Sequence, residues 1–219
     1  MTGITRVSIA SGEALESIFS DLNNLVVVTT TSEQYVNSFG FTEEEVFAAL
    51  DEYGMEDRQE EVKRWYDSFT FGSKRDIYNP WSILNYLKTR KSSAYWANTS
   101  SNSLVGKLIR EGSRDVKMTM ENLLRGETFY TEIDEQIVFK QLDYSQSAIW
   151  SLLLASGCLR VESYDELVPG GGRWEYGLKL TNMEVRLMFE RMIEVWFRIQ
   201  REAGADRMNV FIIDNGLKD

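Results

Sequence analysis

The sequence has 219 residues, which is enough for one large domain or two small ones. Its 34 acidic and 24 basic side chains give a net charge of −10, so the protein as a whole repels nucleic acid and only a local basic patch could bind it. With no histidine and a single cysteine, the chain excludes histidine-dependent catalysis, zinc sites with histidine ligands and an intramolecular disulfide.

The cysteine content and the hydropathy pattern favour a cytoplasmic location. One cysteine, Cys158, fits a reducing compartment. The first residues lack the basic-then-apolar pattern of a signal peptide, and no apolar run approaches the roughly 20 residues that span a bilayer. We therefore expect no membrane partner.

The overall pattern predicts a mainly α protein with small β elements (α+β). We expect residues 1–133 to form a helical subdomain, although the β-branched run at residues 25–29 is typical of a strand. Residues 32–66 are predicted to be helical throughout. Within them, Thr42 and Glu45 have the spacing of a capping box, and Gly54 is expected to end the helix that follows.

Aromatic side chains gather in the block from Trp65 to Ser82, which we expect to join the segments on either side. Residues 68–71 are predicted to be extended, ending at Gly72, and residues 72–76 to form a turn. Asn79 and Pro80 have the residue types preferred at the cap and the first position of a helix. Two further helices and a strand at residues 128–133 complete the first subdomain.

Residues 134–199 are predicted to form a second, winged-helix-like subdomain. The pattern gives a helix, two strands joined by a glycine-rich hairpin tip at residues 169–172, and a long amphipathic helix. We expect Thr181 and Glu184 to form the capping box of this last helix. Residues 200–219 are expected to be a linker and C-terminal extension, with a short strand at residues 210–214.

Several collinear segments together resemble the bacterial AAA-ATPase-like family, whose members often carry a PD-(D/E)XK nuclease-like domain after the ATPase part. The resemblance extends over roughly residues 2–197. The matching segments are residues 2–8, 17–25, 39–46, 65–82, 95–102, 148–153 and 182–185.

The sequence lacks the motifs on which catalysis in that family depends. It contains no G-x-x-x-x-G-K-[ST] motif, and the resemblance begins after the phosphate-binding core. No Glu-x-Lys follows Asp214, so the nuclease signature is also missing. The resemblance therefore implies the lid and winged-helix portion alone, with no catalytic residue, no cofactor unless a separate core supplies ATP and Mg²⁺, and a protein partner or self-association.

By resemblance, the candidate nucleotide contacts are Asn79, Pro80 and Arg6. Related ATPases place a proline at the start of a lid helix against the adenine. The alternatives are a capped helix start for the first two and a surface arginine for Arg6.

The hairpin offers a candidate nucleic-acid surface, in Arg160, Arg173 and Lys179. This surface is the basis of an alternative function, a nucleotide- or DNA-binding module. Arg186 and Arg191 on the last helix could also contact DNA, but acidic residues on the same helix favour contacts with protein.

Two further groups have a structural and a functional interpretation. Trp65, Tyr66 and Asp67 mark either a ligand site or a core aromatic pair followed by a capping carboxylate. The acids between Asp51 and Glu61 favour a solvated helix face, so no metal site is predicted.

Overall fold

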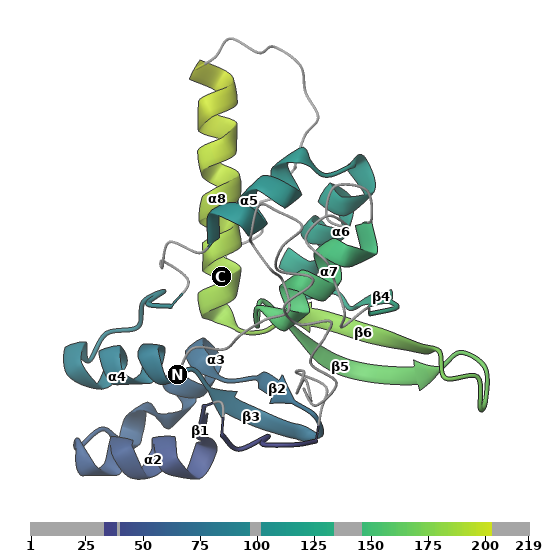
Figure 1. Ribbon diagram of the computed structural model, residues 1–219. Coiled ribbons are helices and arrows are strands. Elements are labelled where there is room, and N and C mark those ends of the chain that lie inside the picture. Colours follow the sequence, from purple (N-terminus) through teal and green to yellow (C-terminus); the bar gives the residue numbers. More distant parts are fainter. Residues whose placement is uncertain (1–32, 39, 97–101, 134–145, 203–219) are drawn as a thin grey trace, which may run out of the picture.

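The computed structural model describes residues 33–38, 40–96, 102–133 and 146–202 (Figure 1). Helices and two three-stranded antiparallel sheets make up this part of the chain, which confirms the predicted α+β class. Within these ranges no helix combines the length and the apolar character needed to cross a bilayer. Arg6 and the predicted strands at residues 25–29 and 210–214 lie outside the described residues.

The first unit is a small sheet with strand order β1-β3-β2, covered by helices. Its core contains Val46, Leu50, Val62 and Tyr66, which are all buried. Its elements are β1 (Phe41–Thr42), α2 (Glu43–Glu52), the 3-10 helix η1 (Glu56–Arg58), α3 (Gln59–Tyr66), β2 (Phe69–Phe71), β3 (Lys74–Tyr78) and α4 (Pro80–Thr89).

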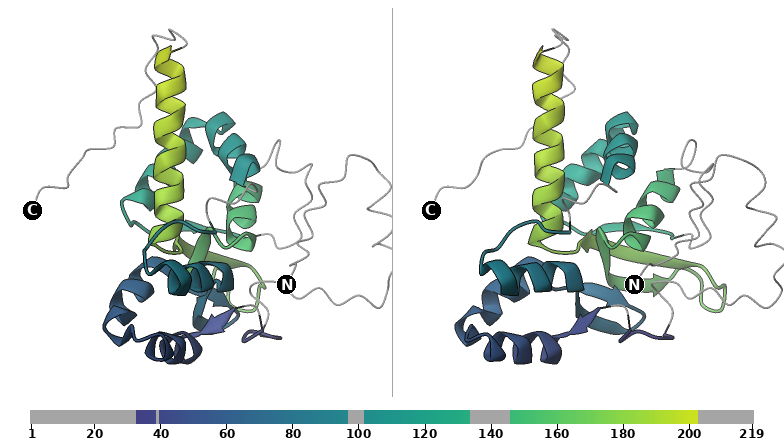
Figure 2. Two further views of the ribbon diagram at one scale, coloured as in Figure 1. Left: turned by 90° about the vertical axis from the view of Figure 1, so that its left-hand side faces the viewer. Right: turned by 60° about the vertical axis from the view of Figure 1, so that its left-hand side comes forward.

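The second unit has a sheet with strand order β4-β6-β5 and a separate core. Its elements are α5 (Asn102–Glu111), α6 (Arg114–Leu124), β4 (Phe129–Thr131), α7 (Gln146–Ala155), β5 (Leu159–Glu166), β6 (Trp174–Leu180) and α8 (Met183–Glu202). In the views of Figures 1 and 2, α8 begins beside the first unit and extends away from it.

Two predicted helix starts are confirmed. The Thr42 amide donates to Glu45 Oε2 (2.9 Å) and the Glu45 amide donates to Thr42 Oγ1 (3.3 Å), which is the reciprocal pairing of a capping box. At α4, Asn79 Oδ1 accepts from the Trp81 amide at 2.9 Å, and Pro80 occupies the first turn.

The prediction that residues 32–66 are helical throughout is wrong. Residues 33–38 form turns, with Tyr35 at a φ of 61°, and Phe41–Thr42 is a strand. The physical reason is strand pairing: Phe41 lies opposite Tyr78, and Thr42 lies opposite Ile77. This pairing helps to bury Ile77 and Tyr78, and no local pattern within residues 32–42 reveals it.

The turn predicted at residues 72–76 is shorter in the structure. Lys74 already belongs to β3 and lies opposite Phe71, so Gly72 and Ser73 alone connect the strands. Arg75 and Asp76 are exposed and Lys74 is half-buried, so the start of this strand has the polar composition of a loop.

The described residues form two hydrophobic cores: the buried residues of the first end at Leu87, and those of the second begin at Ala94. Ile109 of α5 and Met120 of α6 share the second core with Phe189 of α8, and β4 pairs with β6. Residues 102–131 therefore pack with the second unit, whereas the predicted subdomain boundary places them in residues 1–133.

Candidate functional site

The two units meet at the N-terminus of α8, where Glu184 is fully buried. Glu184 Oε2 accepts a hydrogen bond from Ser82 Oγ of α4 at 2.8 Å. Glu184 Oε1 accepts from the Trp96 backbone amide at 2.6 Å. One carboxylate from the second unit thus binds the first helix turn of α4 and the segment that connects the units.

The capping box predicted at Thr181 is wrong, because these side chains have tertiary partners. Asn182 is the cap: its Oδ1 accepts from the Val185 amide at 3.1 Å. Thr181 Oγ1 instead donates to the Gly157 carbonyl at 2.7 Å, and Glu184 turns toward the first unit. Asn182 also crosses the junction, since its Nδ2 donates to the Asp67 carbonyl at 3.0 Å.

Phe69 of β2 provides the apolar part of the junction. Its ring meets Trp96 edge-on, with 5.8 Å between centroids. Gly157, which has a φ of 78°, also lies against this ring, and its missing side chain leaves room for it. Nearby, Arg75 Nη2 donates to the Glu162 carbonyl at 3.0 Å.

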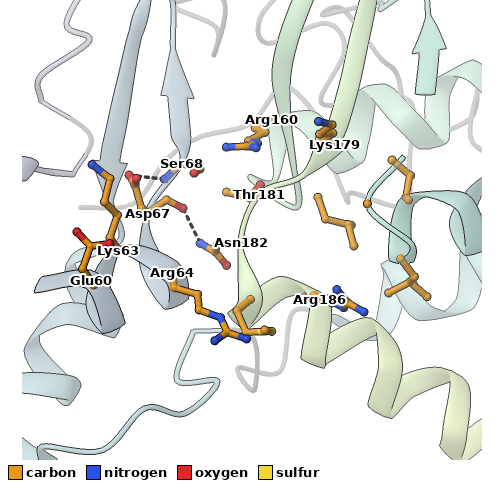
Figure 3. Close-up of a pocket in the computed structure, with 15 residues that line it drawn as sticks. Glu60, Lys63, Arg64, Asp67, Ser68, Arg160, Lys179, Thr181, Asn182 and Arg186 are labelled. Carbon is orange, nitrogen blue, oxygen red and sulfur yellow. Dashed lines mark hydrogen bonds between the residues drawn. The ribbon is translucent and has the colours of Figure 1, made fainter. Parts of the chain in front are cut away.

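An open cavity of about 530 Å³ lies at this junction (Figure 3). Its walls come from α3, the chain entering β2, the end of α6, the β5–β6 hairpin and the first turn of α8. The lining residues are Glu60, Lys63, Arg64, Asp67, Ser68, Leu123, Leu124, Gly126, Arg160, Lys179, Leu180, Thr181, Asn182, Met183 and Arg186.

Basic side chains dominate this lining, with five cations against two acids. Acids outside the lining form salt bridges with four of these five cations. Glu162 pairs with both Arg160 (3.3 Å) and Lys179 (3.6 Å). The remaining pairs are Lys63 with Glu43, and Arg186 with Glu190 at 2.8 Å. No salt bridge of the described residues involves Arg64.

Asp67 is the acid with the most altered chemistry in the cavity. Burial raises the pKa of Asp67 to about 6. The hydrogen bond that the Ser68 amide donates to Asp67 Oδ1 acts in the opposite direction and lowers this pKa. Negative charge on Asp76 and Glu43 raises this pKa further, and Lys63 lowers it. Asp67 therefore changes charge near neutral pH.

We expect Asp67→Asn to stabilise the protein at pH 7.5 by on the order of 1 kcal/mol, a value reduced for solvent screening in an open cavity. The folded pKa of Asp67 lies above its ordinary value of 3.8, so its protonation stabilises the fold fully below pH 4. That contribution is lost as the pH rises through about 6. Urea unfolding of both proteins from pH 4 to pH 8 measures this difference. A gap that does not widen with rising pH would contradict the prediction.

The structure places the predicted hairpin cations in two locations. Arg160 and Lys179 are cross-strand partners and line the cavity. Arg173 lies at the far end of the hairpin, where its Nε donates to Glu132 Oε2 at 3.0 Å. No sequence pattern predicts that Arg160 and Lys179 lie near Lys63 and Arg64, because strand register and the docking of the units bring them together.

Other predicted residues have structural partners. Asn79 uses its side-chain oxygen to cap α4, and Tyr66 is a buried core residue that packs edge-on against Tyr86. In the described ranges, no group of three or more Cys, Asp or Glu side chains is placed to hold a metal ion.

A second, smaller hollow of about 370 Å³ lies between the β2–β3 and β5–β6 hairpins. Tyr164, Trp174 and Tyr176 line it, and the Tyr164 and Trp174 rings lie 5.7 Å apart. Tyr164 is 62% exposed, so this hairpin presents aromatic surface to solvent.

Comparison with known proteins finds one significant similarity among curated sequences. The chain is 26% identical over 172 residues to an uncharacterized protein in the vnfD 5′ region of Azotobacter chroococcum mcd 1. The alignment covers 78% of this chain but 30% of that protein, so the chain spans less than a third of its length. No family model matches the sequence, and no solved structure gives a significant match.

Proposed function

We propose that this chain is the lid and winged-helix part of an AAA-ATPase-like protein, without the P-loop core, and that it acts through protein contacts and not as a catalyst. The collinear resemblance over residues 2–197 supports this proposal. Helix α7 is followed by the β5–β6 hairpin and then by helix α8, and β4 completes the sheet. This order of elements has the outline of a winged helix.

An exposed apolar face on α4 is the observation that carries the proposal. Trp81 is 56% exposed and Leu84 is 55% exposed, and the two lie one helical turn apart. They adjoin Asn79 and Pro80, which the resemblance implies lie near a nucleotide. A lid separated from its core would leave such a face uncovered, and large exposed apolar side chains mark sites of association. The partner we propose for this face is a P-loop core.

The alternative, a DNA-binding module, has less support. A DNA-reading helix places exposed side chains in the major groove. In α7, the helix before the hairpin, residues 148–154 are all buried. The hairpin cations do not form one surface, because Arg160 and Lys179 line the cavity at the junction and Arg173 pairs with Glu132 at the far end of the hairpin. The net charge of −10 also opposes binding to an extended phosphate backbone.

The single thiol fits a reducing, cytoplasmic setting. Cys158 is buried, and burial raises the pKa of its thiol to about 11, so it is unreactive at neutral pH. We propose no catalytic residue and no cofactor in this chain. ATP and Mg²⁺ would be bound by the separate core.

The double variant Trp81→Ser/Leu84→Ser tests the proposed contact. We expect the wild-type chain to bind a purified P-loop core of an AAA-ATPase-like protein and the variant to bind at least about tenfold more weakly, since each buried apolar side chain contributes about 1.5–3 kcal/mol. Sedimentation velocity measures the complex.

The matched control is Tyr130→Ser, which removes an aromatic side chain that is 54% exposed on β4 in the other unit. It should leave the complex intact. Equal binding by wild type and the α4 double variant would refute the contact. ATP turnover by the purified wild-type chain, absent from a mock purification, would refute the non-catalytic assignment.

A further inference from the structure

The cavity between the two units is a site that the proposed contacts at α4 do not use. Figure 3 shows Arg160 and Lys179 on one side, Arg64 and Arg186 on the other, and Asn182 between them. Five cations and two acids line the cavity, and acids outside the lining pair with four of the cations, which leaves Arg64 without a salt bridge among the described residues. A concave site rich in cations attracts anionic ligands.

Arg160 supplies the clearest indication that a ligand is missing. Its Nε is buried and has no hydrogen-bond acceptor in the described part of the chain. Buried polar atoms are nearly always paired, and the exceptions need a reason such as an absent ligand. Its Nη2 and Lys179 Nζ share the Glu162 carboxylate, so one acid balances two cations.

The first turn of α8 adds a second anion-binding element. Asn182 and Met183 line the cavity, and the N-terminus of a helix carries a partial positive charge that favours an anion. The Glu184 side chain does not occupy this space, because its two oxygens accept from Ser82 and Trp96 elsewhere in the junction.

The size and the remaining lining define the ligand class. A volume of about 530 Å³ falls within the range of roughly 300–1,000 Å³ that small organic ligands occupy. Leu123, Leu124 and Met183 provide apolar surface beside the cations. A guanidinium group donates in a fork that fits the oxygens of a phosphate.

We propose that this cavity binds a small organic phosphate, with the phosphate held by Arg160, Lys179 and the first turn of α8, and the organic part against Leu123, Leu124 and Met183. Arg64, which has no acid partner among the described residues, strengthens the attraction from the opposite side. The ligand bridges both units, so its binding stabilises their junction.

Isothermal titration at low salt with pyrophosphate, ADP and glucose 6-phosphate tests the site. We expect pyrophosphate to bind the wild-type protein, and tighter binding of either organic phosphate would support the proposal and identify the organic part. Arg160→Gln, Lys179→Gln and Arg64→Gln should each weaken binding about tenfold or more. Arg173→Gln removes the same charge outside the cavity and should leave binding unchanged.

Two controls separate a loss of binding from a loss of folding. Arg64 is exposed and unpaired among the described residues, so its variant should fold like the wild type. In the wild-type protein, pyrophosphate should protect Lys179 from acetylation, while Lys107, which is exposed on α5, should react as before. Both measurements report on the cavity without a disruptive substitution.

Three outcomes would overturn the proposal. The first is no binding of any of the three phosphates at low salt, with no protection of Lys179. The second is binding that the cavity variants and Arg173→Gln weaken equally. The third is binding of duplex DNA that depends on Arg173 while the small phosphates do not bind.

Discussion

Glu184→Ala is expected to lower the free energy of unfolding by about 2–4 kcal/mol, a large part of the stability of an ordinary domain. The substitution leaves Ser82 Oγ and the Trp96 amide without their acceptor at a buried position. Each unsatisfied group costs about 1–3 kcal/mol, and the relief from burying a carboxylate offsets part of the total. Urea unfolding followed by tryptophan fluorescence measures the change.

The controls for this prediction separate hydrogen bonding from helix composition. Glu184→Gln keeps an oxygen for Trp96 and can donate to Ser82, so it should recover all but about 1 kcal/mol. Glu190→Ala removes an acid from the same helix that pairs with Arg186 at 2.8 Å near the surface, and it should cost less than about 1 kcal/mol. If Glu184→Ala is no worse than Glu190→Ala, then Glu184 does not hold the two units together.

Gly157→Ala is expected to destabilise the protein by about 2–5 kcal/mol. Its φ of 78° lies in a region that disfavours alanine, and the new Cβ would lie 2.6 Å from Phe69 Cε1. Phe69 is 8% exposed and its ring also packs against Trp96, so the ring has little room to move. Thermal and urea unfolding measure the loss.

Gly54→Ala is the matched control, since Gly54 has a φ of 65° but no neighbouring atom within 4 Å of the added Cβ. It should cost about 1–2 kcal/mol from the backbone alone. Adding Phe69→Leu to Gly157→Ala should restore part of the stability, because the two changes share one contact. Equal losses for both glycine variants, with no coupling to Phe69, would refute the proposed steric role of Gly157.

Local chemistry in the sequence predicted helix starts and element types well. Thr42 with Glu45, and Asn79 with Pro80, have partners within three residues, so the signals that set these caps are contained in the sequence itself. The hairpin and the two helices around it also follow from periodicity and from glycine at the turn. Thr181 and Glu184 have the same spacing as Thr42 and Glu45, yet the same inference failed there.

The difference lies in burial. Thr42 and Glu45 are at the surface, where the nearest backbone amide is the best available partner. Glu184 is buried beside Ser82, 102 residues away in the chain, and a buried carboxylate takes whichever donors enclose it. Local pattern therefore determined the class of fold and most helix ends, because those depend on neighbours in the chain. The docking of the two units alone decided the junction and its cationic cavity, because strand register and long-range burial bring Arg64, Arg160 and Lys179 together.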